Sequence, residues 1–142
     1  MAVPAAVSLV TLGVDDVTRA TAFYETLGWE RSTASTDEVS FFRTAGAILA
    51  LWGRADLAED ANVAASGGDA GSVSLAVNVG AEALVDEALA TAERAGATIL
   101  EPARRTPWGG YQGYFRDLDG HLWEVAHNPG WPLGPDGLPR LP

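Results

Sequence analysis

The sequence contains no cysteine and no lysine, and it has only two histidines, His121 and His127. The absence of cysteine excludes disulfide bonds, thiolate metal sites and cysteine nucleophiles. Two histidines cannot supply a three-histidine metal site from one chain. Nineteen acidic residues against nine arginines give a formal net charge of −10. We therefore expect no binding to nucleic acid or to an anionic membrane surface.

The length and composition indicate an ordinary globular protein. The 142 residues fit one domain over residues 1–142, and 47% hydrophobic against 20% charged residues argues against disorder. The N-terminal residues lack the basic region and apolar core of a signal peptide, and no apolar run approaches the roughly 18 residues of a membrane span. These features predict a cytoplasmic protein. Five tryptophans are the conspicuous surplus.

The first half of the sequence predicts one strand, one helix and three further strands. Asp15 and Asp16 are suited to cap the helix, and Gly28 is suited to end it, because glycine readily adopts the positive φ of a helix stop. A tight turn at Ala45 and Gly46 joins the last two strands. The expected strands are 7–14, 29–33, 39–44 and 47–53, with the helix at 16–27.

The second half repeats this order after a segment that predicts a short helix and a linker, residues 54–71. The expected strands are 72–79, 97–102, 110–117 and 121–127, the helix is at 84–95, and the tail is at 128–142. A turn at residues 117–120 joins the last two strands. Residues 46–51 and 120–125 align between the halves and place Ala50 opposite Glu124. The fold class is therefore α+β, with two tandem βαβββ modules at about 7–53 and 72–127.

Three segments carry a resemblance to a known family: residues 10–16 (VTLGVDD), residues 23–29 (FYETLGW) and residues 114–124 (YFRDLDGHLWE). They resemble the vicinal oxygen chelate superfamily, the group of glyoxalases, bleomycin-resistance proteins and extradiol dioxygenases. The resemblance covers residues 7–127. One departure is Leu118, where the family often has proline.

The resemblance implies that each module curls into an incomplete barrel and that the two form a U-shaped, partly open mixed-sheet cavity. In the metal enzymes of the family the ligand positions correspond to Leu9, Ala50, Ser74 and Glu124. Only Glu124 has a side chain suited to a divalent metal, which takes three or four nitrogen or oxygen ligands. We expect no metal and no other cofactor. The family also implies a homodimer, whose partner chain could donate a ligand.

Side-chain alternation along strands extends this assignment. If Ala50 faces the cavity, Ile48 and Trp52 do so too, and if Glu124 does, Trp123 points into the core. Together with the positions that the resemblance implies, and with nearby aromatic and polar side chains, the expected ligand-binding residues are Leu9, Thr11, Phe42, Ile48, Ala50, Trp52, Ser74, Trp108, Tyr111, Phe115 and Glu124.

A cavity of this composition suits a planar aromatic molecule, with a few polar anchors. Our first hypothesis is a non-catalytic protein that sequesters an aromatic or polycyclic natural product, as antibiotic-resistance members of the resembled family do. The alternative is a lyase, isomerase or oxygenase in which Glu124 acts with or without a divalent metal. A sensor or accessory subunit is a third hypothesis, and an aromatic core with a collapsed cavity is the structural alternative.

Overall fold

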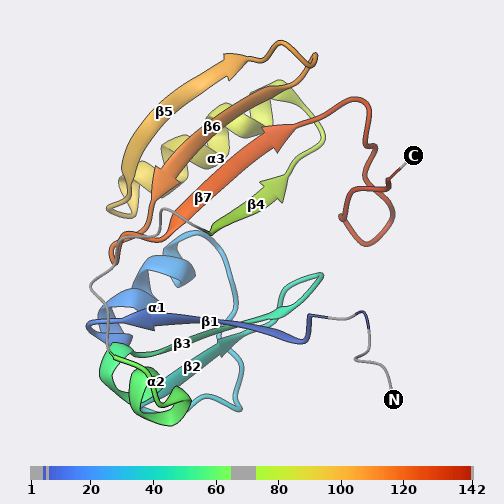
Figure 1. Cartoon of the computed structure of the whole chain (residues 1–142). Helices are drawn as coiled ribbons and strands as arrows, with labels where there is room; N and C mark the ends of the chain where they lie inside the picture. Colours follow the sequence, from blue (N-terminus) through green and yellow to red (C-terminus); the bar gives the residue numbers. More distant parts are fainter. Residues whose placement is uncertain (1–4, 6, 65–72, 142) are drawn as a thin grey trace. The chain divides into compact units, whose positions relative to one another are not determined.

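The computed structural model describes residue 5, residues 7–64 and residues 73–141. The chain divides into two compact units, Met1–Ser66 and Gly67–Pro142. Each unit combines one β-sheet with helices, and both sheets are open in the described residues (Figure 1). The predicted α+β fold of tandem modules is confirmed, and the U-shaped arrangement of the modules stays a prediction. No helix in these residues is long and apolar enough to cross a membrane.

The first unit has a three-stranded sheet with the strand order β1-β3-β2. Strand β1 is parallel to β3, and β2 is antiparallel to it. The elements follow the chain as β1 (Leu9–Val14), α1 (Val17–Thr26), β2 (Val39–Phe42), β3 (Ile48–Gly53) and α2 (Arg54–Ala61).

Helix α1 begins and ends as the sequence predicts. The Asp16 carboxylate accepts a hydrogen bond of 3.1 Å from the backbone N–H of Arg19, and Gly28 has a φ of +95°. A buried hydrogen bond of 2.7 Å between the hydroxyls of Thr21 and Ser40 links α1 to β2. The side chains of the unit that are less than one-tenth exposed include Leu12, Val14, Ala20, Phe23, Tyr24, Phe42, Leu49 and Leu51.

The strand predicted at residues 29–33 is reduced to an isolated β-bridge between Arg31 and Phe42. The backbone N–H of Ser32 still donates to the carbonyl of Phe41. The hydroxyl of Ser35, however, accepts the hydrogen bond from the N–H of Phe41 at 2.9 Å. A side chain therefore takes the place of the backbone carbonyl that would have continued the ladder.

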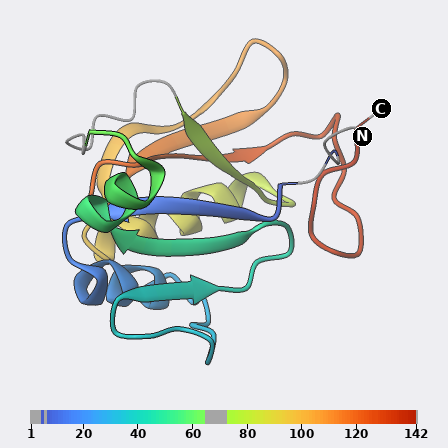
Figure 2. The same ribbon diagram turned by 60° about the horizontal axis from the view of Figure 1, so that its bottom comes forward.

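The segment predicted to be a short helix and a linker, residues 54–71, begins with helix α2. Figure 2 shows α2 (green) beside the end of β1 (blue). A Cβ added at Gly13 would lie 3.3 Å from Cγ of Arg54, so the glycine permits this close approach. Residues 65–71 of the predicted linker lie outside the described residues.

The second unit has a four-stranded sheet with the order β4-β7-β6-β5. Strand β4 is parallel to β7, and the β7–β6 and β6–β5 pairs are antiparallel. The elements are β4 (Ser74–Asn78), α3 (Glu82–Arg94), β5 (Thr98–Arg105), β6 (Tyr111–Arg116) and β7 (Leu122–His127).

Helix α3 lies along one face of this sheet (Figure 1). Val85, Leu89 and Ala92 form its buried stripe. Gly113 of β6 permits the close approach, because a Cβ there would lie 2.5 Å from Cδ1 of Leu89. Below the helix, the rings of Phe115 and Trp123 are stacked with centroids 6.2 Å apart. The core role predicted for Trp123 is confirmed by its exposure of 5%.

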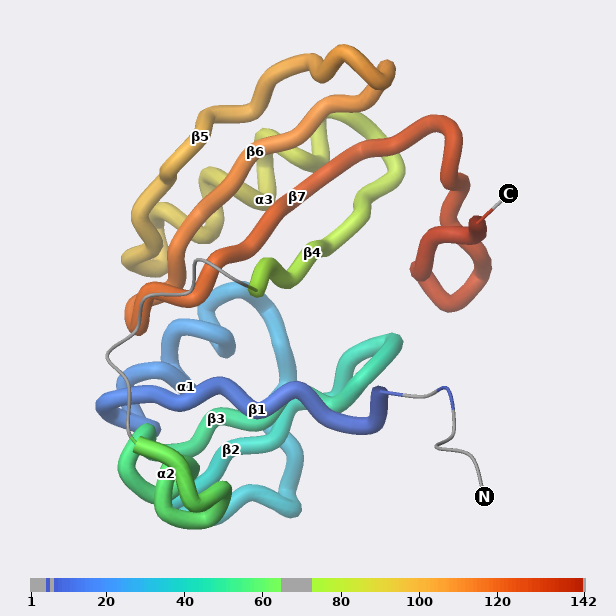
Figure 3. Tube along the Cα trace, viewed as in Figure 1, coloured from blue at the N-terminus to red at the C-terminus, as the bar shows by residue number. Residues whose placement is uncertain are grey.

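The tail after β7 curls into a loop (red in Figure 3). Leu133 and Pro139 form an isolated antiparallel bridge across it. Trp131 is 41% exposed. The proline- and glycine-rich composition therefore yields turns rather than a further strand or helix.

Candidate functional site

The face of the second sheet opposite α3 carries most of the polar side chains of that sheet, and we call it the polar face. The hydroxyl of Tyr111 donates to Asp86 of α3, which fixes Tyr111, Gly113 and Phe115 on the helix side. The strand register then arranges the polar face in three rows. The rows are Ser74, Leu122, Arg116 and Thr98; Ala76, Glu124, Tyr114 and Glu101; and Asn78, Ala126, Gln112 and Arg104.

The central row contains a hydrogen-bonded pair, Tyr114 and Glu124. The two residues face each other across the β6–β7 ladder, and the Tyr114 hydroxyl donates to Oε2 of Glu124 at 2.6 Å. Both side chains are half-buried. A hydrogen bond to a carboxylate is short and strong compared with one between neutral groups. The pair is therefore a well-defined polar feature on an otherwise regular strand pair.

The hydrogen bond to Glu124 is the main cause that raises the pKa of Tyr114 above its ordinary value of 10.0, and burial and the charge of Glu124 act in the same direction. The phenol is therefore protonated at neutral pH, and its O–H donates a hydrogen bond to the carboxylate. The lone pairs left over on both side chains are hydrogen-bond acceptors. The pair consequently favours a ligand group that donates a hydrogen bond.

The first sheet has an apolar face on the side opposite α1. The contact of Ser40 with Thr21 of α1 fixes the helix side, and the register places Phe41 beside Ala50 and Thr11 on the other side. The residues of this apolar face are Leu9, Thr11, Gly13, Val39, Phe41, Ile48, Ala50 and Trp52. It therefore includes the predicted set Leu9, Thr11, Ile48, Ala50 and Trp52.

Phe42, which we predicted to be a ligand-binding residue, lies in the core. It has no exposed surface and its ring centroid lies 6.0 Å from that of Tyr24 in α1. The neighbouring Phe41 is the aromatic side chain on the face of Ala50, because residues paired across an antiparallel ladder share a face. Phe42 therefore lies one residue away from the face of Ala50, on the side of α1, and its role in ligand binding stays a prediction.

Tyr111 and Phe115 also lie on the helix side of their sheet rather than with Glu124. The Tyr111 hydroxyl donates to Asp86 at 2.7 Å, and this hydrogen bond raises the pKa of Tyr111. Phe115 is 4% exposed and stacks on Trp123. Both residues lie an odd number of positions from Tyr114 along β6, so they face the opposite side of the sheet. Their role in ligand binding stays a prediction.

The remaining predicted residues, Ser74 and Trp108, lie in the second unit. Ser74 is an exposed residue of the polar face, but Ala76 is the β4 residue opposite Glu124. Trp108 is 52% exposed in the loop between β5 and β6. Its ring lies over Gly110, where an added Cβ would be 1.8 Å from a ring carbon.

The positions that bind metal in the resembled enzymes do not fit a divalent ion here. Leu9 and Ala50 carry no ligating atom, Ser74 offers a neutral hydroxyl, and Glu124 already accepts a hydrogen bond from Tyr114. Among the described residues, no group of three or more His, Asp or Glu side chains could hold a metal ion. We therefore assign the site no chemistry that depends on a metal.

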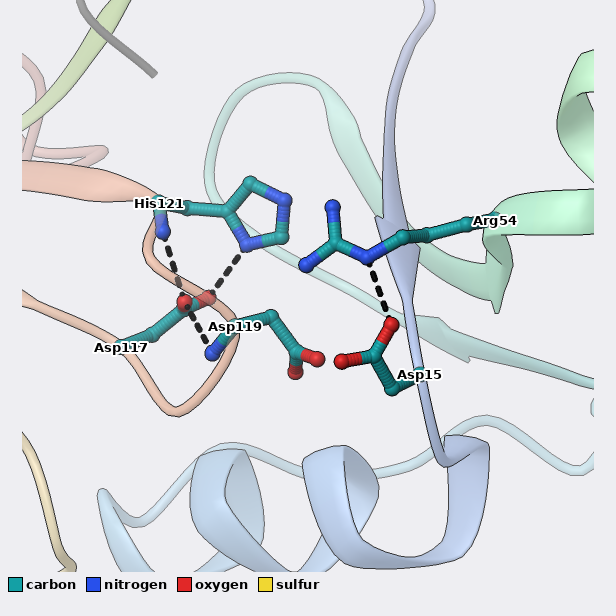
Figure 4. Close-up of polar contacts among 5 residues, drawn as sticks. All are labelled: Asp15, Arg54, Asp117, Asp119 and His121. Atoms are coloured by element: carbon teal, nitrogen blue, oxygen red, sulfur yellow. Dashed lines mark hydrogen bonds and ion pairs between the residues drawn. The ribbon is translucent and has the colours of Figure 1, made fainter. Parts of the chain in front are cut away.

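A network of hydrogen bonds at the β6–β7 turn fixes the register that brings Tyr114 to Glu124 (Figure 4). The carboxylate of Asp117 is 2% exposed and accepts from the backbone N–H groups of Asp119 at 2.9 Å and His121 at 2.8 Å. The Nδ1 atom of His121 lies 2.8 Å from the other carboxylate oxygen. His121 therefore helps to hold the β6–β7 turn through its contacts with Asp117.

The side chains of His127 in the second unit and Arg54 in the first unit also form hydrogen bonds. The Nδ1 atom of His127 lies 3.0 Å from the carbonyl of Val79, which ties the end of β7 to the loop after β4. In the first unit, Nε of Arg54 donates to Asp15 at 2.7 Å (Figure 4). This contact joins the start of α2 to the end of β1.

Tyr114, Gln112 and Arg116 were not among the residues predicted from the sequence, although the sequence contains a signal for them. The predicted turn at residues 117–120 implies that residues equally far from Asp119 face each other, and Tyr114 and Glu124 are such a pair. Counting residues outward from this turn gives the pairing of β6 with β7 and would therefore have identified the residues of the polar face.

The family "Glyoxalase/Bleomycin resistance protein/Dioxygenase superfamily" matches residues 6–125. Among solved structures, a glyoxalase-related enzyme from Fulvimarina pelagi is 39% identical, with a TM-score of 0.90 over 97% of this chain and 99% of that chain. A comparison with proteins of curated function found no match.

Two further solved structures are more distant. A lactoylglutathione lyase from Agrobacterium tumefaciens is 28% identical, covers 88% of this chain and 95% of its own, and has a TM-score of 0.67. A glyoxalase/bleomycin resistance protein/dioxygenase from Nocardioides is 25% identical, covers 89% and 85% respectively, and has a TM-score of 0.72. All three similarities extend over most of each chain.

Proposed function

The chain belongs to the glyoxalase/bleomycin resistance protein/dioxygenase superfamily, and from this membership and the geometry of the polar face we propose that it binds and sequesters a hydroxylated aromatic or polycyclic molecule without transforming it. The observation that carries the proposal is the pairing of Glu124 with the Tyr114 hydroxyl. Glu124 is the one acidic side chain among the four positions that correspond to metal ligands, and here its partner is a phenol.

The chemistry of the pair selects the ligand group. The Tyr114 O–H already donates its hydrogen bond to Glu124, so the pair offers a ligand only acceptor lone pairs and no hydrogen-bond donor. A hydroxyl or N–H group on the ligand satisfies this need. Beside the pair, Ala76 and Leu122 provide small or apolar surface against which a ring can pack.

The apolar face of the first sheet favours the same class of ligand. Phe41 and Trp52 flank Ala50 there, and both rings are half-buried. Aromatic rings contribute about 0.5–1.5 kcal/mol per pair beyond the area they bury. The composition of this face therefore supports an aromatic ligand.

Isothermal titration calorimetry with a panel of hydroxylated aromatic and polycyclic compounds, including aromatic antibiotics, tests the proposal. We expect at least one compound to bind with a Kd below roughly 100 μM, which corresponds to more than about 5 kcal/mol of binding free energy. Tyr114→Phe and Glu124→Gln should each weaken that binding about tenfold. Glu87→Gln, on the exposed side of α3, is the control and should leave the affinity unchanged. Failure of every compound to bind would refute the proposal.

An enzymatic function is a second candidate, because the 39% identical structure is of a glyoxalase-related enzyme. In that case the Glu124 carboxylate would act as a general base on a substrate proton, and Tyr114 would orient it. The discriminating measurements are lactoylglutathione lyase activity and the metal content of the purified protein. Activity lost in Glu124→Gln, or a stoichiometric metal lost in Glu124→Ala, would favour the enzyme over the binding protein.

A further inference from the structure

Arg116 differs from the other arginines in its surroundings. Arg31, Arg54, Arg94, Arg105 and Arg140 each contact a polar group or an acid. In the part of the chain that the structure describes, the guanidinium groups of Arg19, Arg43, Arg104 and Arg116 have no hydrogen bond or ion pair. The first three are exposed to solvent, whereas Arg116 is half-buried. A guanidinium that gives up part of its hydration without a partner is unfavourable unless another group satisfies it.

The position of Arg116 relates it to the site. It follows Tyr114 by two residues on β6, so both side chains lie on the polar face, one row apart. The residues paired with Arg116 across the two ladders are Leu122 and Thr98, neither of which carries a charge. The rise of a strand places the two rows about 7 Å apart. One ligand of the size of two fused rings can therefore reach both rows.

We propose that Arg116 binds a carboxylate of the ligand while the Tyr114–Glu124 pair accepts the ligand's hydroxyl, so that the protein selects hydroxylated aromatic carboxylates. This inference rests on the proposed binding function and adds the charge of the ligand. The planar guanidinium can donate two parallel hydrogen bonds to a carboxylate. Its single positive charge matches a carboxylate better than a phosphate, which carries about −1.5 to −2.

The charges around the site determine the orientation of the ligand. The chain has a formal net charge of −10, and the central row itself contains Glu101 and Glu124. An anion at the central row would be repelled, whereas each of the two neighbouring rows offers one arginine and no acid. Of these two arginines, Arg104 is exposed to solvent and Arg116 is half-buried, so Arg116 gains more from a bound anion. The carboxylate therefore points to Arg116, and the hydroxyl points to Glu124.

The test uses 6-hydroxy-2-naphthoate and its uncharged methyl ester, titrated by calorimetry into the full chain. We expect the acid to bind about tenfold or more tightly than the ester, as two charge-assisted hydrogen bonds imply. Arg116→Gln should weaken the binding of the acid about tenfold and leave the affinity for the ester unchanged. Arg116→Lys should cause an intermediate loss of affinity for the acid. The matched control is Arg104→Gln, an exposed arginine on the same face, which should change neither affinity by more than about twofold.

The outcomes separate the two proposals. Equal binding of acid and ester to the unmodified chain, or an unchanged acid affinity in Arg116→Gln, would overturn the role of Arg116 and leave the aromatic-binding function in place. Binding of neither compound would contradict the role of Arg116 and count against the proposed function as well. If Arg116→Gln does not fold, Arg116→Lys and the acid-to-ester ratio decide. If added salt weakens the binding of the acid but not that of the ester, this would support an ionic contact between Arg116 and the carboxylate.

Discussion

The hydroxyl of Tyr114 lies 2.6 Å from Oε2 of Glu124, so a side-chain hydrogen bond crosses the same two strands that the backbone ladder joins. The carboxylate is thereby held on the polar face in one orientation. Arg116, two residues beyond Tyr114, brings a positive charge to the adjacent row. The site is defined by these three side chains, and only Glu124 was a candidate from the sequence.

Replacing Tyr114 by phenylalanine should lower the free energy of unfolding by about 1 kcal/mol, the net value of a partly exposed hydrogen bond. Chemical denaturation at neutral pH measures this loss. Circular dichroism should show an unchanged fold, because the ring is kept. An unchanged stability would mean that the hydrogen bond contributes nothing in solution.

The contribution of Tyr114 should depend on pH in a defined direction. Its pKa in the folded chain is raised above the ordinary value of 10.0, mainly by the hydrogen bond to Glu124. The stability linked to it is therefore fully present below about pH 10 and is lost as the pH rises through the folded pKa. The difference in stability between the unmodified chain and Tyr114→Phe should shrink as the pH rises above about 10. A constant difference over this range would contradict the raised pKa, and Tyr111, present in both proteins, cancels in the comparison.

Replacing Asp117 by alanine should destabilise the chain by about 3 kcal/mol, because two backbone N–H groups and the ring of His121 lose a buried acceptor. Asp136 provides the control, since its carboxylate also accepts from a backbone N–H, that of Leu138, but is exposed. Asp136→Ala should cost less than about 1 kcal/mol. If urea denaturation gave the same loss in free energy of unfolding for both variants, the buried hydrogen bonds of Asp117 would stabilise the chain no more than the exposed one of Asp136.

Phe41 and Phe42 should differ sharply although they are adjacent. Phe42→Ala should cost about 3–5 kcal/mol, because its side chain is fully buried against Tyr24. Phe41→Ala should cost about 1 kcal/mol, since the ring is only half-buried on the apolar face. Thermal denaturation of both variants measures the difference. If Phe41→Ala were the more destabilising variant, the assignment of Phe42 to the core and Phe41 to the apolar face would be wrong.

Gly113 should not tolerate a methyl group, because an added Cβ would lie 2.5 Å from Cδ1 of Leu89 and 2.9 Å from the carbonyl oxygen of Glu101. Gly113→Ala should therefore cost about 1–3 kcal/mol through overpacking. At Gly80 a Cβ would meet no atom within 4 Å, so Gly80→Ala is the control and should change stability by less than about 0.5 kcal/mol. Unfolding curves that coincide for both variants would contradict the close packing of α3 on β6.

Most of the fold could be predicted because its signals are local. The alternation of Leu122 to His127 and the helical stripe of Val85, Leu89 and Ala92 each indicate one buried side. The strand at residues 29–33 failed because the Ser35 hydroxyl competes for the N–H of Phe41, a contact across six residues that periodicity does not register.

The predicted ligand-binding residues that lie on the helix sides of their sheets, Phe42, Tyr111 and Phe115, were chosen for one reason. Aromatic residues were assigned by type, whereas the face of a strand depends on odd or even distance from a turn. Phe115 pairs with Trp123, and Phe42 pairs with Leu49, both core residues. The turns themselves were predicted, so Tyr114 and Phe41 were within reach of the sequence.

The sequence by itself determined the tandem modules, because they follow from local periodicity. The family resemblance of its motifs then implied that Leu9 and Ala50 stand at positions where the metal enzymes have ligands. Only the tertiary structure decided that Tyr114 is the partner of Glu124 and that Arg116 is half-buried with no polar partner among the described residues. A hydrogen bond requires a distance and a direction, and burial requires every neighbouring element. Both are properties of the folded chain rather than of any segment of it.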